Sequence, residues 1–170
     1  MSHRAFIAAA ALAVLASCAR EPERFPPPPQ RSLGVGAFVE MKDPDAGEYI
    51  VSGTRDFSEG AGWRWTHQRP ELRFKLRRTE GWRFSLDLGL PAPNMEQTGP
   101  VTITFFINGR RLDRVRYPKP GDFHFEKAVP PEWLKSGELN VFAAYVEPSW
   151  VSPDGEKLGF VLQRAGFVSQ

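Results

Sequence analysis

From residue 63 onward, apolar side chains recur at every second position of this sequence. Two segments show the alternation most clearly, with polar or charged residues between the apolar ones: Leu72, Phe74 and Leu76 in the first, and Trp82, Phe84, Leu86 and Leu88 in the second. Successive side chains of a β-strand point to opposite faces, so this pattern predicts strands that are buried on one face. Beyond residue 17, no long window keeps the 3.6-residue period of a helix, and we therefore expect little helix.

The later part of the sequence predicts a hairpin and further strands. Residues 101–107, VTITFFI, alternate in the same way and run into Asn108-Gly109, a strong turn signal between antiparallel strands, which is followed by RRLDRVRY. Strands are also expected in VGAFVEM, EYIVSG, DFHFEKAV, ELNVFAAYV and LGFVLQRAGFV, with a turn-rich KDPDAG between the first two and one helical turn in PPEWLKSG. Several short strands at near-regular spacing indicate an all-β fold, an antiparallel β-sandwich or a barrel.

The composition fits one domain with a hydrophobic core. The chain has 170 residues, of which 41% are hydrophobic and 25% are charged, and its net charge is +2. A charge this near zero offers no field of one sign to nucleic acid or an acidic membrane surface, so we expect no nucleic-acid partner. The single cysteine excludes a disulfide within the chain, and the folded part must therefore depend on its core.

The first seventeen residues have the three regions of an export signal. Arg4 supplies a positive charge, residues 5–15 are apolar, and small residues precede Cys18. The apolar run has about half the length that a membrane-spanning helix needs, so a retained helical anchor is the weaker interpretation. An ordinary secretory signal followed by an incidental free cysteine remains the alternative.

Residues 15–18, LASC, resemble the lipobox of bacterial lipoproteins. The resemblance implies transfer of a diacylglyceryl group to Cys18, cleavage before it and acylation of the new amino group, so that acyl chains hold the protein at a lipid bilayer. Ala19, rather than Asp, follows the cysteine, so the common inner-membrane retention signal of related lipoproteins is absent. We therefore expect an outer-membrane anchor in the bacterial cell envelope, on the periplasmic or the outer face.

A proline-rich tether is expected between the lipidated cysteine and the folded part. Pro26–Pro29 should hold a stiff polyproline segment, and at about 3.1 Å per residue the tether could lift a domain about 40 Å from the bilayer. The predicted organisation is a signal peptide at 1–17, the lipidated cysteine and tether at 18–33, and a β-sandwich domain at 34–170.

Four segments in order, GWRWTHQRPELRF, FFINGRRLDRV, PPEWLKSGELNVFAAY and PDGEKLGFVLQRAGF, resemble the jelly-roll, galactose-binding-like modules found in bacterial envelope proteins and appended to some glycosyltransferases. The resemblance covers residues 62–167. It implies a carbohydrate-binding-module-like sandwich of two facing antiparallel sheets, often a role in holding glycans, and no chemistry of its own. It carries over no sugar-contacting residue, and an immunoglobulin-like sandwich is the alternative fold.

Signs of chemistry are few. The chain has no Gly-x-Ser-x-Gly elbow, phosphate-binding glycine loop or His-Glu-x-x-His helix, and we expect neither catalysis nor a cofactor. His124 alternates with two phenylalanines and is expected to be exposed on a strand face; an enzyme would need a cleft that unites His124 or His67 with a carboxylate. Asp43, Asp45 and Glu48 could gather oxygens around calcium, but Asp-Pro and Ala-Gly turns explain the same residues, and we favour the turn.

Tryptophans provide the remaining lead, because flat apolar rings beside hydrogen-bonding groups suit a sugar ring. Trp150 lies in EPSWVSPDG, which is expected to be a long polar loop at one end of the sandwich, where the ring could also pack as the loop's own lid. Arg64, His67 and Trp65 are its candidate companions in a ligand site, although we expect Trp63, Trp65 or both to fill the core. The other two tryptophans are expected in structural positions, in the core and in the capping turn: Trp82 and Trp133.

Two functions fit these observations. The first is an envelope lipoprotein whose non-catalytic sandwich binds glycan or another envelope component. The second is a structural or assembly lipoprotein that presents a protein-binding face to an envelope or secretion complex.

Overall fold

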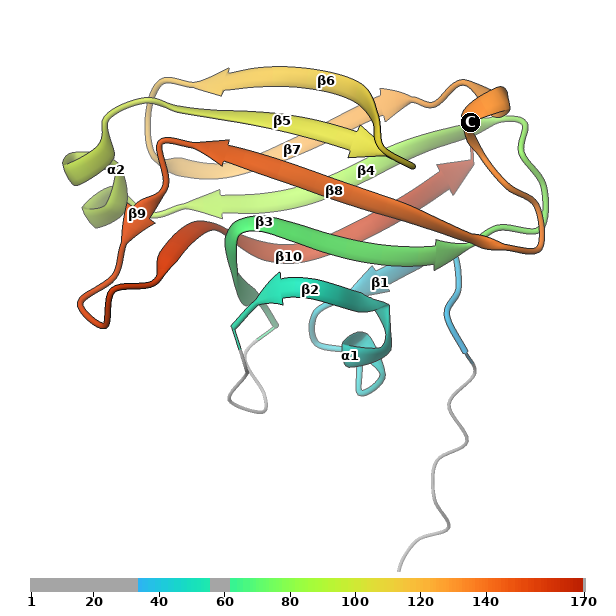
Figure 1. Cartoon of the computed structure of the whole chain (residues 1–170), viewed down its shortest axis with the longest axis horizontal. Helices are drawn as coiled ribbons and strands as arrows, with labels where there is room; N and C mark the ends of the chain where they lie inside the picture. Colours follow the sequence, from blue (N-terminus) through green and yellow to red (C-terminus); the bar gives the residue numbers. More distant parts are fainter. Residues whose placement is uncertain (1–33, 56–61, 170) are drawn as a thin grey trace, which may run out of the picture. The chain divides into compact units, whose positions relative to one another are not determined.

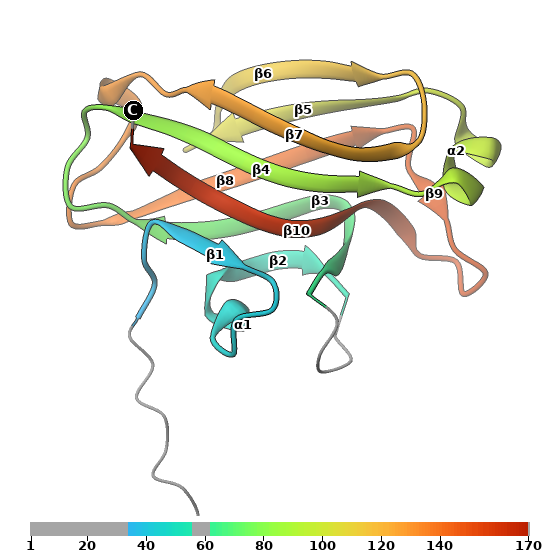
Figure 2. The same cartoon turned by 180° about the vertical axis from the view of Figure 1, so that it is seen from behind.

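The computed structural model describes residues 34–55 and 62–169, and within them antiparallel strands form two facing sheets (Figures 1 and 2). The predicted signal peptide, Cys18 and the tether lie outside the described residues. In spatial order, sheet I contains β2 (Ile50–Thr54), β3 (Arg64–Lys75), β8 (Leu139–Glu147), β5 (Val101–Ile107) and β6 (Arg110–Tyr117). Sheet II contains β1 (Phe38–Glu40), β10 (Lys157–Ser169), β4 (Trp82–Leu90) and β7 (Gly121–Ala128), and the short β9 (Trp150–Val151) also pairs with β10.

The two sheets are joined along β10. Near its start, β10 pairs with the first residues of β3, so that Trp65 lies opposite Val161, and further along the same edge it pairs with β1. Its other edge pairs first with β9 and then with β4. The chain crosses between the sheets at most of its connections, and the result is the antiparallel jelly-roll β-sandwich that the sequence predicted.

The core lies between the sheets and is rich in phenylalanine. The residues of the predicted alternation, Leu72, Phe74 and Leu76, are all buried, and so are Phe84, Leu86 and Leu88 on the facing strand. Phe84 stacks on Phe142 across the two sheets with ring centroids 4.3 Å apart, and Phe74 meets Phe167 edge to face at 5.7 Å. For these six residues, the period-two pattern therefore identified the inward face correctly.

The hairpin and the capping turn were also predicted correctly. Asn108 and Gly109 both have positive φ angles, 49° and 77°, as a two-residue turn between antiparallel strands requires. Pro131–Trp133 forms a single 3-10 turn, with the ring of Trp133 partly buried against the core.

Two short α-helices depart from the prediction. α1 (Ala46–Tyr49) takes the first residues of the expected strand EYIVSG, so that β2 begins only at Ile50. α2 (Ala92–Thr98) follows Pro91 and ends before Gly99, whose φ is 71°. Neither is long enough to display a helical period in the sequence. Of the helices in the described residues, none has the length and apolar character to cross a membrane.

Asn140 is a fully buried polar residue that fastens one end of sheet I. Its side-chain oxygen accepts hydrogen bonds from the Asn108 amide at 2.9 Å and from the Lys135 backbone at 2.9 Å, and its nitrogen donates to the Lys135 carbonyl at 2.9 Å. Asn108 in turn donates to the Trp133 carbonyl at 2.7 Å. The pair thereby ties the β5–β6 turn to the capping turn and to the start of β8.

We predict that Asn140→Ala lowers the free energy of unfolding by about 2 to 4 kcal/mol, because it removes a fully buried amide side chain and leaves the partly buried groups of Asn108 and Lys135 without this partner. The measurement is urea unfolding followed by circular dichroism. Asn94→Ala is the matched control, since the side-chain nitrogen of Asn94 has no hydrogen-bond partner among the described residues. Equal stability losses in the two variants would contradict the role of the Asn140 network.

Candidate functional site

The two predicted ligand-site tryptophans, Trp65 and Trp150, lie close together at one end of the sandwich. Trp65 lies near the start of β3 and Trp150 is the first residue of β9; β3 and β9 pair with opposite edges of β10, on either side of Leu158. The two indole rings are 5.9 Å apart between centroids and inclined by 34°, and both are half-buried. The pair therefore presents aromatic surface to solvent from a position fixed by three strands.

Trp150 stands on a strand, not in the long loop that the sequence suggested. β9 pairs with Lys157 and Leu158, and a tight turn closes this hairpin, in which the Gly155 backbone donates to the Ser152 carbonyl at 2.8 Å. β9 has only two residues, which is too short for an alternating pattern to reveal it. The strand holds the indole in one orientation toward Trp65.

Gln97 of α2 forms a hydrogen bond with the side chain of Trp150. Its side-chain oxygen accepts a hydrogen bond of 2.9 Å from the Trp150 indole nitrogen. α2 and β9 lie side by side at this end of the domain in both views (Figures 1 and 2). Sequence reasoning did not find Gln97, because α2 itself was not predicted.

A chain of charged groups borders the ring pair. The Arg55 guanidinium forms ion pairs with both Asp154 and Glu156, and the Nε2 atom of His67 lies 3.6 Å from a carboxylate oxygen of Glu156. His67 is two residues from Trp65 and so lies on the same face of β3. The Ser152 hydroxyl and Arg55 lower the pKa of Asp154, which stays ionised. Donors and acceptors for a polar ligand thus flank the rings.

Arg64, the fourth candidate, lies on the other face of β3. Strand alternation puts it on the side of Thr66, which is fully buried and exchanges hydrogen bonds of 3.0 and 2.9 Å with the Phe160 backbone.

The expectation that Trp63 or Trp65 fills the core is therefore wrong. Thr66 takes the inward position, Trp65 is half-buried and Trp63 is 42% exposed. WRWT does alternate with a period of two, but Thr66 faces inward and Trp65 outward, which is the reverse of the expectation.

Gly159 explains how the strands come so close beneath the site. A Cβ atom at this position would lie 2.7 Å from the His67 carbonyl oxygen and 2.8 Å from the Thr66 hydroxyl. Only glycine fits between β10 and β3 at this point without a shift of the backbone.

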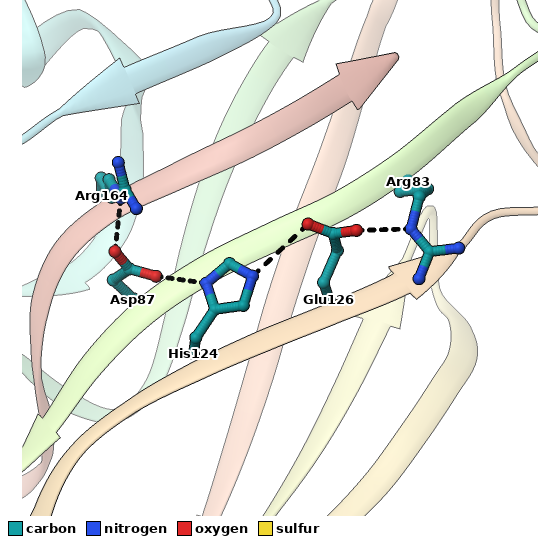
Figure 3. A network of polar contacts seen from close by, with 5 residues as sticks. All are labelled: Arg83, Asp87, His124, Glu126 and Arg164. Carbon is teal, nitrogen blue, oxygen red and sulfur yellow. Dashed lines mark hydrogen bonds and ion pairs between the residues drawn. The ribbon is translucent and has the colours of Figure 1, made fainter. Parts of the chain in front are cut away.

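The second described histidine belongs to a different place, the outer face of sheet II. There, Arg164, Asp87, His124, Glu126 and Arg83 form a continuous polar network across β10, β4 and β7 (Figure 3). The Nδ1 atom of His124 lies 2.5 Å from Asp87, and the Nε2 atom lies 3.4 Å from Glu126. The side chain is 51% exposed, as predicted for a strand face. The network lies on the outer, solvent-facing side of sheet II.

The acidic segment between β1 and α1 forms the predicted turn. The Asp43 carboxylate accepts a hydrogen bond from the Glu40 backbone at 3.0 Å, and the Asp43 carbonyl accepts one from Ala46 at 3.0 Å. The Asp45 carbonyl accepts from Glu48 at 2.8 Å. Among the residues that the structure describes, no three His, Cys, Asp or Glu side chains are grouped closely enough to hold a metal ion.

No protein-family model and no curated protein sequence matches this chain. Among solved structures, it is similar to a family 35 carbohydrate-binding module from an environmental isolate, with 13% identity and a TM-score of 0.48 over 78% of this chain and 96% of the module. A family 35 module from Paenibacillus barcinonensis is 12% identical and has a TM-score of 0.42, over 79% of this chain and 100% of the module. An acetyl xylan esterase from Butyrivibrio proteoclasticus is 11% identical and has a TM-score of 0.43, over 81% of this chain and 34% of the esterase.

We predict that His124 makes the stability of the domain depend on pH. Hydrogen bonding to Asp87 raises the pKa of His124 above its ordinary value of 6.5, with a further contribution from Glu126. The folded state therefore holds this proton more tightly than the unfolded state. The resulting stability is fully present below pH 6.5 and is lost as the pH rises through the raised pKa.

The measurement compares urea unfolding of the native chain and of His124→Gln between about pH 5.5 and pH 9. The native chain should be the more stable at the acidic end, by at most about 1 kcal/mol because the pair is half-exposed, and the difference should shrink toward the alkaline end. A difference that stays constant with pH would rule out this coupling.

Proposed function

We propose that this protein is an outer-membrane lipoprotein whose β-sandwich is a non-catalytic module that binds glycan through Trp65 and Trp150. The observation that carries the proposal is the preformed ring pair, held half-exposed at one end of the sandwich by β3, β9 and β10. The sequence resemblance to carbohydrate-binding modules supports the same function.

The chemistry of the site suits a sugar. The apolar CH face of a pyranose ring packs on an indole, and its hydroxyl groups require hydrogen-bond partners around the rim. Here the rim offers the Gln97 amide, His67 and the ion pairs of Arg55 with Asp154 and Glu156. Both rings are already fixed before a ligand arrives, so binding loses little side-chain freedom.

The anchoring part of the proposal rests on the sequence. The export signal, the lipobox-like LASC and the lone Cys18 support acylation at that residue, and a group with two or three acyl chains gives stable attachment without a spanning segment. Ala19 supports the outer membrane as the destination. The proline-rich residues that follow would act as a spacer between bilayer and domain.

The glycan site predicts that Trp150→Ala weakens binding about tenfold or more, because it removes one stacking surface worth about 1.4 kcal/mol. A glycan array identifies the oligosaccharide, and titration calorimetry then compares the variants. Val151→Ala is the matched control: it changes the next residue of the same strand, which is 54% exposed and points away from Trp150. Trp150→Phe, which keeps an aromatic face, should retain part of the affinity.

An array on which no glycan binds would contradict the proposal. Recovery of a protein complex by crosslinking, with no glycan binding, would favour the alternative, an assembly lipoprotein that presents a protein-binding face. If Trp150→Ala and Val151→Ala bind a glycan equally well, the site lies elsewhere on the domain.

Acylation predicts that Cys18→Ser releases the protein from the membrane fraction. In cells that export the native chain, mass spectrometry should find the mature protein starting at Cys18 with added acyl mass, and the variant should lack that mass. The readouts are fractionation and intact mass. A native protein whose Cys18 thiol is unmodified would disprove the lipid anchor and leave the glycan site untouched.

A further inference from the structure

A cavity of about 1100 Å³ lies at the end of the domain opposite to the tryptophan pair. β3 spans the distance between them, since Trp65 is near its start and Lys75 is its last residue (Figure 1). Ten residues of strand correspond to about 30 Å. The cavity is therefore a separate feature and not an extension of the proposed glycan site.

Hydrogen bonds between distant segments hold the walls of this cavity together. The Gly36 backbone donates to the Tyr49 hydroxyl at 2.9 Å, and the Lys75 backbone donates to the Gly36 carbonyl at 2.9 Å. On the other side, Gly137 donates to the Leu76 carbonyl at 2.7 Å. The lining thus comes from the first described residues, the end of β3 and the segment before β8.

Trp82 provides an aromatic wall. The sequence placed it in the core, but the structure leaves it half-buried at the core's edge, where it meets Phe167 edge to face at 6.4 Å. Its indole nitrogen donates to the Arg78 carbonyl at 3.0 Å, and the Arg78 guanidinium lies 5.5 Å from the ring centroid. The ring is therefore fixed, with a cation beside it.

Three cations line the cavity together with Trp82: Lys75, Arg77 and Arg78. All three are exposed, and no carboxylate of the described chain forms an ion pair with any of them. Asp45 is the single carboxylate in the described lining. Arginines elsewhere, such as Arg83 and Arg164 in the sheet II network, have carboxylate partners. The local excess of positive charge is thus available to an external anion.

The location of the cavity, beside the first described residue, favours an anion on the membrane surface. Gly34, the first described residue, lines it, so the described domain begins at this end. If Cys18 is acylated as proposed, the expected tether of about 40 Å keeps this end within reach of the bilayer. Binding of a second group on the same membrane then takes place at high effective concentration, so that even weak attraction holds the domain.

We propose that the cavity beside Trp82 docks the domain on its own membrane by binding the phosphate of an anionic phospholipid headgroup with Lys75, Arg77 and Arg78. Indole rings have an apolar body and a polar N–H and therefore favour the membrane interface, and Trp82 lines this cavity. A bare anion would leave the ring and most of the cavity volume unused. The inference rests on the proposed acylation of Cys18 for the reach of the tether, and it is independent of the Trp65–Trp150 site.

The test measures partition of the full-length Cys18→Ser chain into sedimenting vesicles of phosphatidylcholine, with or without phosphatidylglycerol. The protein should bind the phosphatidylglycerol vesicles more tightly, and added salt should weaken that preference. Arg77→Gln with Arg78→Gln should reduce partition into these vesicles about tenfold or more. Every variant keeps the same first 33 residues, so differences among variants report on the cavity.

Arg114→Gln with Arg116→Gln is the matched control, because it removes the same charge from two exposed arginines of β6. It should leave partition unchanged. Trp82→Phe should weaken binding less than the arginine pair, and thermal unfolding checks that it is folded.

Equal partition into the two vesicle types, or equal loss from the two arginine pairs, would overturn the proposal. So would displacement by inorganic phosphate at low concentration, which would indicate a simple anion site, or displacement by an anionic oligosaccharide, which would indicate a second glycan site. Absence of acyl groups on native Cys18 would show separately, by mass, that the tether premise had failed.

Discussion

The pairing of β3 with the start of β10 is the constraint on which the rest of this structure depends. It joins the two sheets along one edge and brings the backbones so close that position 159 must be glycine. It also decides which side chains of β3 face inward: Thr66 is buried, and Trp65 and His67 are turned outward. Because β9 pairs with the other edge of β10 at the same level, Trp150 comes to lie against Trp65.

Much of the fold could be predicted because burial on one face of a strand leaves a period of two. Leu72, Phe74 and Leu76 follow it, and the hairpin at Asn108-Gly109 follows from the left-handed backbone that such a turn requires. The pattern fails where it is too short or ambiguous. Seven residues of α2 and two of β9 carry too little periodicity, and WRWT fits either phase of a strand, because a hydroxyl can be buried when the backbone of a neighbouring strand satisfies it.

The site shows a further limit of sequence reasoning. Trp65, His67 and Trp150 could be selected by residue type, but their meeting depends on two pairings made by β10, which are properties of the whole fold. Gln97 could not be selected at all. The net charge of +2 was incomplete as a guide in the same way. It does not show that some basic side chains are paired with carboxylates while others lie together in a different part of the domain. Arg83 and Arg164 are paired with carboxylates within the sheet II network. Lys75, Arg77 and Arg78 lie together at one end, and no carboxylate in the described ranges 34–55 and 62–169 forms an ion pair with them.

The placement of Gly34 and the ring pair at opposite ends of the long strands has a mechanical consequence. A pull applied between Gly34 and the ring pair would act along the strand direction, so that the hydrogen bonds of β1 to β10 and of β3 to β8 would be loaded in shear. Bonds loaded in this way must break together, whereas bonds pulled at right angles open one at a time. Such a domain would therefore resist a pull applied between these two ends better than one applied across its strands.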